Sequence, residues 1–204
     1  PPSLPSPILI GDSNTANVTF GDGQGTLDKW MPGMRVKAGH IGEIPSAEDI
    51  GPYRNIIIHT GINSINNLKY RRSNKELINV FEAKCKNIHE VYPRAKIYVS
   101  LLLPTRSRVL NRRVREFNDL ILDMTFNYSN MFVIDHATFG DILSDEHGRW
   151  DAEKSRPKTI DELHLGKIGI RIFAAKIKSA VFNKRGKQSQ ERFRAGGGRY
   201  QAAA

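Results

Sequence analysis

Near its amino terminus the chain runs Ile8-Leu9-Ile10-Gly11-Asp12-Ser13-Asn14, an apolar segment that leads directly into Gly-Asp-Ser. The apolar part fits a buried strand, and the polar residues after it fit a turn into a helix. Ligands of parallel α/β sheets bind at the carboxyl ends of strands, so Ser13 would lie where chemistry is usually done. Taken alone, however, the pattern is better explained by a tight turn in which Ser13 caps the helix.

Four more apolar runs follow and alternate with longer segments of helical periodicity. This alternation is typical of βα units around a parallel sheet. The five expected strands are residues 7–10, 26–31, 55–60, 96–103 and 131–135. We therefore expect a flavodoxin-like three-layer α/β sandwich with a five-stranded parallel sheet in the order 2-1-3-4-5.

Three long helices are predicted between and after these strands. The first begins at Ser73, because Ser73 and Glu76 have the spacing of a capping box, and it ends before Pro93. Cys85 lies on the apolar face of this helix, so we expect a core residue rather than a reactive thiol. The other two helices are expected at residues 109–125 and 167–182.

The length of 204 residues fits one domain with tails. We expect a Pro-rich linker at residues 1–6, the domain at 7–182, and a flexible basic tail containing Gly and Arg at 183–204. The linker-like start indicates that the domain is part of a larger polypeptide. The apolar runs are too short to span a membrane, and no signal peptide precedes them.

The formal net charge is +10, which favours anionic partners such as nucleic acid, phospholipid headgroups or an acidic polymer. The basic tail is a candidate for RNA binding through phosphate contacts and stacking, with a plain linker as the alternative. The single cysteine excludes an internal disulfide and a Cys-rich zinc site. Because no internal disulfide is possible, we expect an intracellular, cytoplasmic location rather than secretion.

Two further motifs carry groups suited to acyl transfer. The strand at 55–60 leads into Gly61-Ile62-Asn63, and the Asn63 amide could donate to a developing oxyanion. A turn-forming Asn is the alternative. Asp161 precedes His164 by three residues, a spacing at which a carboxylate can orient the imidazole and leave Nε2 for a nucleophile. The pair Asp145 and His147 is instead assigned to a solvated loop.

In the expected strand order, the ends of strands one, two and three are neighbours, so Ser13, Asn63 and the loop after strand two should meet. A glycine in that loop could offer an unobstructed amide to the same oxyanion. Gly33 is the first choice, and Gly42 is the alternative because a shorter strand at residues 35–37 could precede it. Both glycines also fit plain turns.

These blocks resemble, in order and spacing, the SGNH (GDSL-like) hydrolase superfamily over about residues 8–182. The blocks are Gly-Asp-Ser at 11–13, Pro-Gly-x-x-Val at 32–36, His-x-Gly-x-Asn at 59–63, Ser-x-x-x-Pro at 100–104, Asn118, and Asp-x-x-His-Leu at 161–165. Within the superfamily, the set is most similar to the esterase-like domains of non-LTR retrotransposon proteins.

The resemblance implies a serine esterase that works without a metal or organic cofactor. Ser13 would be the nucleophile, His164 the general base and Asp161 the residue that orients it. The amides of Ser13 and Gly33 and the side chain of Asn63 would form the oxyanion hole. Many relatives have Asp where this chain has Ser64, from which we expect altered geometry rather than lost activity.

The expected substrate is a small ester, with short acyl chains as the first expectation and anionic or lipid-derived esters as alternatives. Arg106 and Arg108 follow the fourth strand and could form a rim for an anionic ligand. The arginines that follow in the next predicted helix fit this rim and a solvated helix face equally well. They are Arg112, Arg113 and Arg115. The alternative function is a catalytically weak RNA-binding module of a retroelement or viral polyprotein.

Overall fold

The computed structural model describes residues 6–16, 18, 27–28, 30–67, 69, 71–105, 107–135 and 163–182. Five parallel strands form one sheet in the order β2-β1-β3-β4-β5, which confirms the flavodoxin-like α/β prediction. The strands are β1 Ile8–Gly11, β2 Met34–Lys37, β3 Asn55–His59, β4 Lys96–Ser100 and β5 Met131–Ile134.

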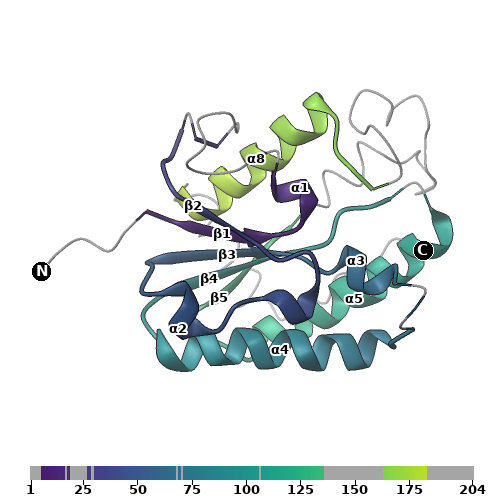
Figure 1. The fold of residues 1–204 in the computed structure, drawn as a ribbon, viewed down its shortest axis with the longest axis horizontal. Helices are drawn as coiled ribbons and strands as arrows, with labels where there is room; N and C mark the ends of the chain where they lie inside the picture. Colours follow the sequence, from purple (N-terminus) through teal and green to yellow (C-terminus); the bar gives the residue numbers. More distant parts are fainter. Residues whose placement is uncertain are drawn as a thin grey trace, which may run out of the picture.

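Helices cover both faces of the sheet (Figure 1). The face shown downward carries α2 Ala47–Ile50, α4 Asn74–Val91 and α5 Arg108–Phe126, with α3 Ile62–Ile65 and the 3-10 helix η1 Ile41–Glu43 nearer the carboxyl edge. The opposite face carries α8 Lys167–Phe182 and the short α1 Ser13–Ala16. No helix in the described ranges is long and apolar enough to cross a bilayer.

Two hydrophobic cores follow from this layering. The larger core contains Phe81 of α4 and Phe117 of α5, and the smaller one packs Phe173 of α8 against Leu9 and Ile57 of the sheet. Since β1 and β3 are covered on both faces, apolar side chains are required at nearly every position. This is why their sequences are continuous apolar runs rather than alternating patterns.

The helix α4 begins as the sequence predicts. The Ser73 hydroxyl accepts a hydrogen bond from the Glu76 amide at 3.2 Å, and the Glu76 carboxylate accepts one from the Ser73 amide at 2.7 Å. Cys85 is completely buried in the larger core, and burial raises the pKa of its thiol. A core role, rather than a reactive one, follows for this cysteine.

The second strand is where the sequence prediction is wrong. The described residues between 26 and 31 form a turn, in which the amides of Trp30 and Met31 donate to the Leu27 carbonyl at 2.9 Å. Leu27 and Met31 are apolar because they pack in the core beneath α8, not because they lie in the sheet. The true second strand, β2, lies at one edge of the sheet and contains Arg35 and Lys37, so it lacks an apolar run.

The other strand and helix predictions differ from the structure by a few residues at most, the largest difference being β4, which ends at Ser100 rather than at residue 103. The expected linker, apart from Ser6, and the expected tail at 183–204 lie outside the described residues. The same holds for Asp145 and His147.

Gly11 ends β1 at a point where the chain passes very close to its neighbours. A Cβ atom there would lie 2.6 Å from the His59 carbonyl oxygen and closer still to the Thr15 side chain. We predict that Gly11→Ala lowers the free energy of unfolding by about 1–3 kcal/mol through overpacking. Urea denaturation measures the change.

Gly42→Ala is the matched control, because a Cβ atom at Gly42 meets nothing within 4 Å. Its effect should stay within about 0.5 kcal/mol. Equal stability of the two variants would contradict the tight packing of β1 against α1 and β3.

Candidate active site

Ser13 is the first residue of α1 and lies two residues beyond Gly11, the carboxyl end of β1. The turn is held by its own side chains: the Asn14 amide donates to Asp12 Oδ1 at 3.0 Å, and the Thr15 hydroxyl donates to the Asp12 carbonyl at 2.6 Å. Asp12, Asn14 and Thr15 are buried, whereas Ser13 is exposed. The turn therefore presents the Ser13 hydroxyl to solvent.

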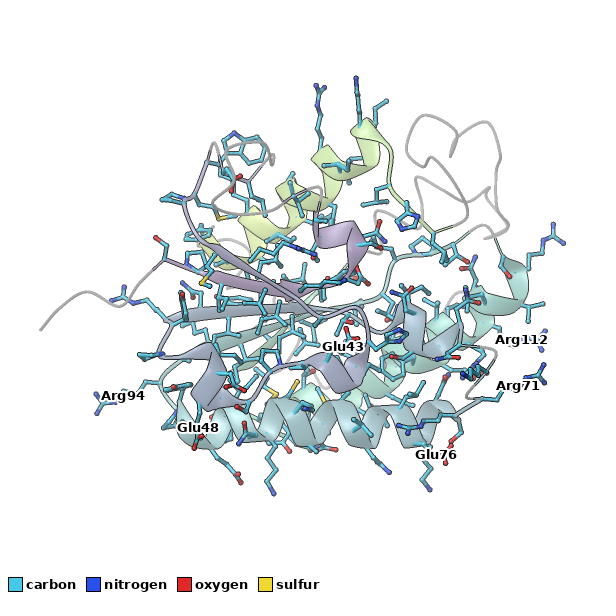
Figure 2. The ribbon with its side chains drawn as sticks, in the orientation of Figure 1. Glu43, Glu48, Arg71, Glu76, Arg94 and Arg112 are labelled. Atoms are coloured by element: carbon cyan, nitrogen blue, oxygen red, sulfur yellow. The ribbon has the colours of Figure 1, made fainter. Side chains whose placement is uncertain are left out.

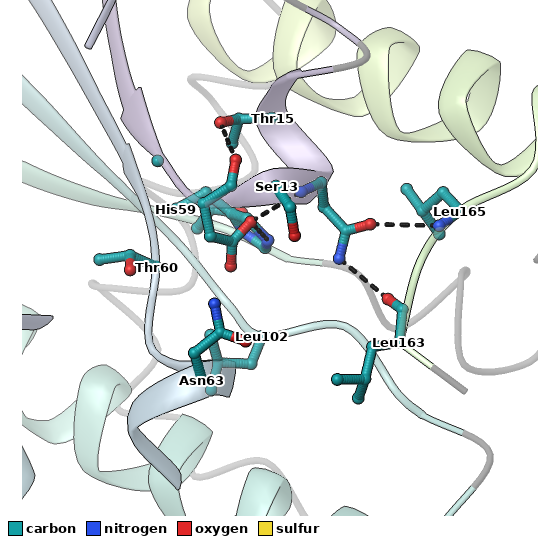
Figure 3. A network of polar contacts seen from close by, with 12 residues as sticks. Ser13, Thr15, His59, Thr60, Asn63, Leu102, Leu163 and Leu165 are labelled. Carbon is teal, nitrogen blue, oxygen red and sulfur yellow. Dashed lines mark hydrogen bonds and ion pairs between the residues drawn. The ribbon is translucent and has the colours of Figure 1, made fainter. Parts of the chain in front are cut away.

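His164 lies next to this hydroxyl, although 151 positions separate the two residues in the chain. The distance between Ser13 Oγ and His164 Nε2 is 3.0 Å, which is within hydrogen-bonding reach. The histidine belongs to the segment just before α8, shown beside Ser13 in Figure 3 through its labelled neighbours Leu163 and Leu165. The structure thus brings together two of the predicted site residues.

The side chain of Asn14 holds the His164 segment in place. Its Nδ2 group donates to the Leu163 carbonyl at 3.0 Å, and its Oδ1 atom accepts from the Leu165 amide at 3.1 Å (Figure 3). Both backbone neighbours of His164 are therefore bonded to the residue that follows Ser13. The sequence alone does not indicate this role, because an Asn after Ser in a turn has many explanations.

Arg35 of β2 supports the turn from the edge of the sheet. Its guanidinium donates to the carbonyl oxygens of Asp12 at 3.0 Å and Gly11 at 3.4 Å, and its Nε donates to the Thr15 hydroxyl at 3.2 Å. This contribution was missed because β2 itself was misplaced. The usable signal was an arginine in a short strand next to β1.

A buried polar group lies under the turn. His59 Nδ1 is 2.9 Å from Ser100 Oγ, and His59 Nε2 is 4.0 Å from Asp12 Oδ1. Burial lowers the pKa of His59 below its ordinary value, with the nearby Asp12 carboxylate opposing the shift. Asp12 Oδ2 is buried and has no hydrogen-bond partner among the described residues. The imidazole is therefore neutral near pH 7 and acts as part of the core.

Asn63 is positioned by the tight exit of the chain from β3. Gly61 has φ of 141°, a conformation that favours glycine, and α3 begins directly after it. Asn63 Nδ2 donates to the Gly39 carbonyl at 2.9 Å, and the Thr60 hydroxyl donates to the Ala38 carbonyl at 2.7 Å. The ends of β3 and β2 are thereby fastened together.

Ser64, which replaces the Asp found in many relatives of the resembled family, also serves this junction. Its buried hydroxyl accepts a hydrogen bond from the Ile41 amide at 3.0 Å. The contact anchors η1 against α3. Ser64 therefore makes a defined hydrogen bond at the position where many relatives have Asp.

The glycine prediction requires correction. Gly33 precedes β2, whereas Ser13 follows β1, and the parallel register pairs Ile8 with Met34. Gly33 thus lies at the amino ends of the strands, and the length of the four-residue strand β2, roughly 13 Å, separates it from the carboxyl edge of the sheet. The error follows directly from placing the second strand too early.

Gly39 is the glycine that follows β2 at the carboxyl edge of the sheet. The pairing of Gly11 with Lys37 continues as a 2.8 Å hydrogen bond from the Ala38 amide to the Gly11 carbonyl, so Gly39 is level with Ser13 at the carboxyl edge. Gly42, the alternative prediction, lies three residues farther on inside η1. The signal that could have identified Gly39 is that it is the first glycine after the short strand at 35–37, with only Ala38 between.

The remaining predicted residues have different outcomes. Asp161 and Arg106 lie outside the described part of the chain. Arg108 is exposed at the start of α5, as a rim residue would be. Arg113 is instead structural, since it donates to the carbonyls of Ile65 at 2.6 Å and Arg72 at 2.8 Å.

Neither a protein-family model nor a curated protein sequence matches the chain. Solved structures do match it. A GDSL-like lipase from Bacteroides thetaiotaomicron has a TM-score of 0.65 at 11% identity, with 85% of this chain and 86% of the lipase covered. The acetyl xylan esterase AlAXEase has a TM-score of 0.63 at 14% identity, with coverage of 86% and 100%.

The OSK domain of Drosophila Oskar is also similar, with a TM-score of 0.58 at 17% identity and coverage of 85% of this chain and 87% of that domain. At these identities the similarity shows the fold. The chain has the SGNH (GDSL-like) hydrolase fold.

We predict that Asn14→Asp lowers the free energy of unfolding by about 1–3 kcal/mol, because the Leu163 carbonyl loses its donor and faces a carboxylate. Urea denaturation followed by fluorescence measures the change. Asn66→Asp, at an exposed position after α3, is the matched control and should change stability by less than about 0.5 kcal/mol. An Asn14→Asp variant that is as stable as the wild type would show that the hydrogen bonds of the Asn14 side chain do not stabilise the fold.

The lowered pKa of His59 predicts a pH dependence of stability. Below about pH 6.5 the unfolded chain binds a proton at this residue and the folded protein does not, so stability falls as the pH drops, by up to about 1.4 kcal/mol per pH unit. Urea denaturation at several values between pH 7.5 and 5 measures this slope. His59→Gln should flatten it, and an unchanged slope in that variant would assign the effect to other groups.

Proposed function

We propose that this protein is a serine esterase that hydrolyses acyl esters through an acyl-enzyme intermediate. The observation that carries the proposal is the 3.0 Å distance between the exposed Ser13 hydroxyl and His164 Nε2. A serine is a weak nucleophile until an adjacent base accepts its proton, and a neutral imidazole at this distance can do so.

In the first half-reaction, Ser13 Oγ attacks the acyl carbon of the ester while its proton passes to His164 Nε2. The carbonyl π bond opens and its electron pair becomes the oxyanion of a tetrahedral intermediate. Collapse of this intermediate breaks the bond between the acyl carbon and the alcohol oxygen. The leaving alkoxide takes the proton back from His164, so the alcohol departs neutral and the acyl group remains on Ser13.

In the second half-reaction, a water molecule gives its proton to His164 and attacks the acyl carbon. The second tetrahedral intermediate releases Ser13 Oγ, which recovers the proton from His164, and a carboxylic acid leaves. No electron transfer occurs, and the proposed scheme uses no cofactor. Asp161, three residues before His164, is proposed to orient the imidazole through Nδ1.

Three groups are proposed to stabilise the oxyanion: the Ser13 amide, the Asn63 side chain and the Gly39 amide, which replaces Gly33. Support for Asn63 and Gly39 comes from their direct hydrogen bond and from their location where β3 and β2 end. Asn63 Nδ2 carries two hydrogens, so it can keep its bond to Gly39 and still donate to a substrate.

The proposed substrates are small esters with short acyl chains. The similar lipase and acetyl xylan esterase bear names that denote ester cleavage, which supports this chemical class. Arg108 is proposed as a rim residue that would favour an anionic group on the substrate.

We predict that wild-type protein hydrolyses p-nitrophenyl acetate or butyrate, and that Ser13→Ala loses nearly all of this turnover because no nucleophile remains. A series of esters from acetate to palmitate measures the chain-length preference. Ser129→Ala, at an exposed position just before β5 and hence at the opposite edge of the sheet, is the matched control and should keep full activity.

Turnover that survives in Ser13→Ala would disprove the nucleophile assignment. A wild-type protein that cleaves no ester of the series would favour the alternative function, a nucleic-acid-binding module consistent with the net charge of +10.

We predict that Asn63→Ala lowers kcat by about 100- to 1,000-fold, the usual cost of losing one oxyanion donor, with a smaller effect on KM. Steady-state kinetics on a short-chain ester measures both constants. Asn66→Ala, on the exposed residue after α3, controls for a general effect on this helix. Near-normal kcat in Asn63→Ala would exclude the proposed role.

A further inference from the structure

Glu43 holds the amide that is proposed to stabilise the oxyanion. The Gly39 amide donates to Glu43 Oε2 at 2.6 Å, and the His40 amide donates to the same oxygen at 3.2 Å. Hydrogen bonds to an ionised carboxylate are shorter and stronger than neutral ones. In the unliganded state, therefore, the Gly39 donor is already occupied.

The position of Gly39 makes this contact relevant to the reaction. The residue is level with Ser13 across the β1–β2 pair, and its carbonyl accepts from Asn63, the other proposed donor. The carbonyl of Gly39 is thus bonded to Asn63, while its amide is bonded to the Glu43 carboxylate. A substrate oxygen that needs this amide must displace Glu43 Oε2.

Glu43 also has an ordinary structural role, since its carboxylate caps the start of η1 by accepting from the amide of His40, the residue before this helix. A neutral glutamine could accept the same two hydrogen bonds. The negative charge is therefore not required for the cap, but it does repel a second negative charge developing at the same amide. Glu43 is exposed, so solvent screens this repulsion and its displacement by a substrate is feasible.

We propose that Glu43 is a gate on the oxyanion site, which occupies the Gly39 amide at rest and lowers the turnover of the esterase. This inference rests on the proposed function. During acylation the substrate carbonyl oxygen replaces Glu43 Oε2 as the acceptor from Gly39, and the carboxylate moves into solvent. No covalent bond to Glu43 forms or breaks.

The test compares Glu43→Gln, Glu43→Ala and the control Glu48→Gln, all on a short-chain ester. Glu43 and Glu48 are both exposed, and they lie on separate elements, η1 and α2 (Figure 2). We expect Glu43→Gln to raise kcat about threefold to tenfold, because the acceptor and cap remain while the competing charge is lost. Glu48→Gln should leave kcat unchanged.

Glu43→Ala separates the gate from the cap. It removes both, so a rise in kcat in this variant, accompanied by a small loss of stability in urea, supports the gate. The amide-proton chemical shift of Gly39 in wild type and Glu43→Gln reports the contact directly. An upfield shift in the variant is expected on loss of the charge-assisted bond.

An unchanged or lower kcat in a folded Glu43→Gln protein would overturn the gate, as long as wild type shows turnover that depends on Ser13. A wild type and a Glu43→Gln variant that are both inactive and both unreactive at Ser13 would overturn the proposed function, and the gate with it. An inactive wild type whose Glu43→Gln variant cleaves ester would support the gate strongly.

Discussion

The buried side chain of Asn14 makes the hydrogen bonds on which the rest of the site depends. One amide group binds the Leu163 carbonyl and the Leu165 amide, and so fixes both sides of His164 beside the turn that carries Ser13. Inside a low-dielectric interior, losing one of these bonds leaves an unpaired polar group, which costs more than the bond itself contributes. Together with the contact between Ser13 and His164, these bonds join two segments that are separated by most of the chain.

Contacts from outside the turn add to the hydrogen bonds within it. Arg35 binds its carbonyl oxygens from β2, and Gly11 lets α1 pack directly on the sheet because no Cβ atom intervenes. Below it, the neutral His59 fills the layer between Ser100 and Phe173. The Ser13 hydroxyl therefore stays exposed while the residues on either side of it are buried, which is the arrangement that the proposed nucleophile would require.

The sequence was sufficient to predict the sheet order and the pairing of Ser13 with His164, because continuous apolar runs and short polar motifs are properties of local sequence. It was not sufficient for β2, whose Arg35 and Lys37 reflect an edge position, nor for Gly39, which depends on where β2 ends. Apolar spacing at Leu27 and Met31 resembled a strand although it came from packing under α8. The roles of Asn14, Arg35 and Glu43 arise from contacts between segments, and no local pattern encodes them.

The central claim is that Ser13 is a nucleophile activated by His164. The most direct measurement is labelling of the intact protein with a fluorophosphonate probe, followed by peptide mapping, in wild type and in His164→Gln. The account predicts one adduct, on Ser13, that forms at least about 100-fold more slowly in the His164 variant, since general-base catalysis typically contributes that much. Labelling of another serine, no labelling of wild type, or equal rates in the two proteins would contradict it.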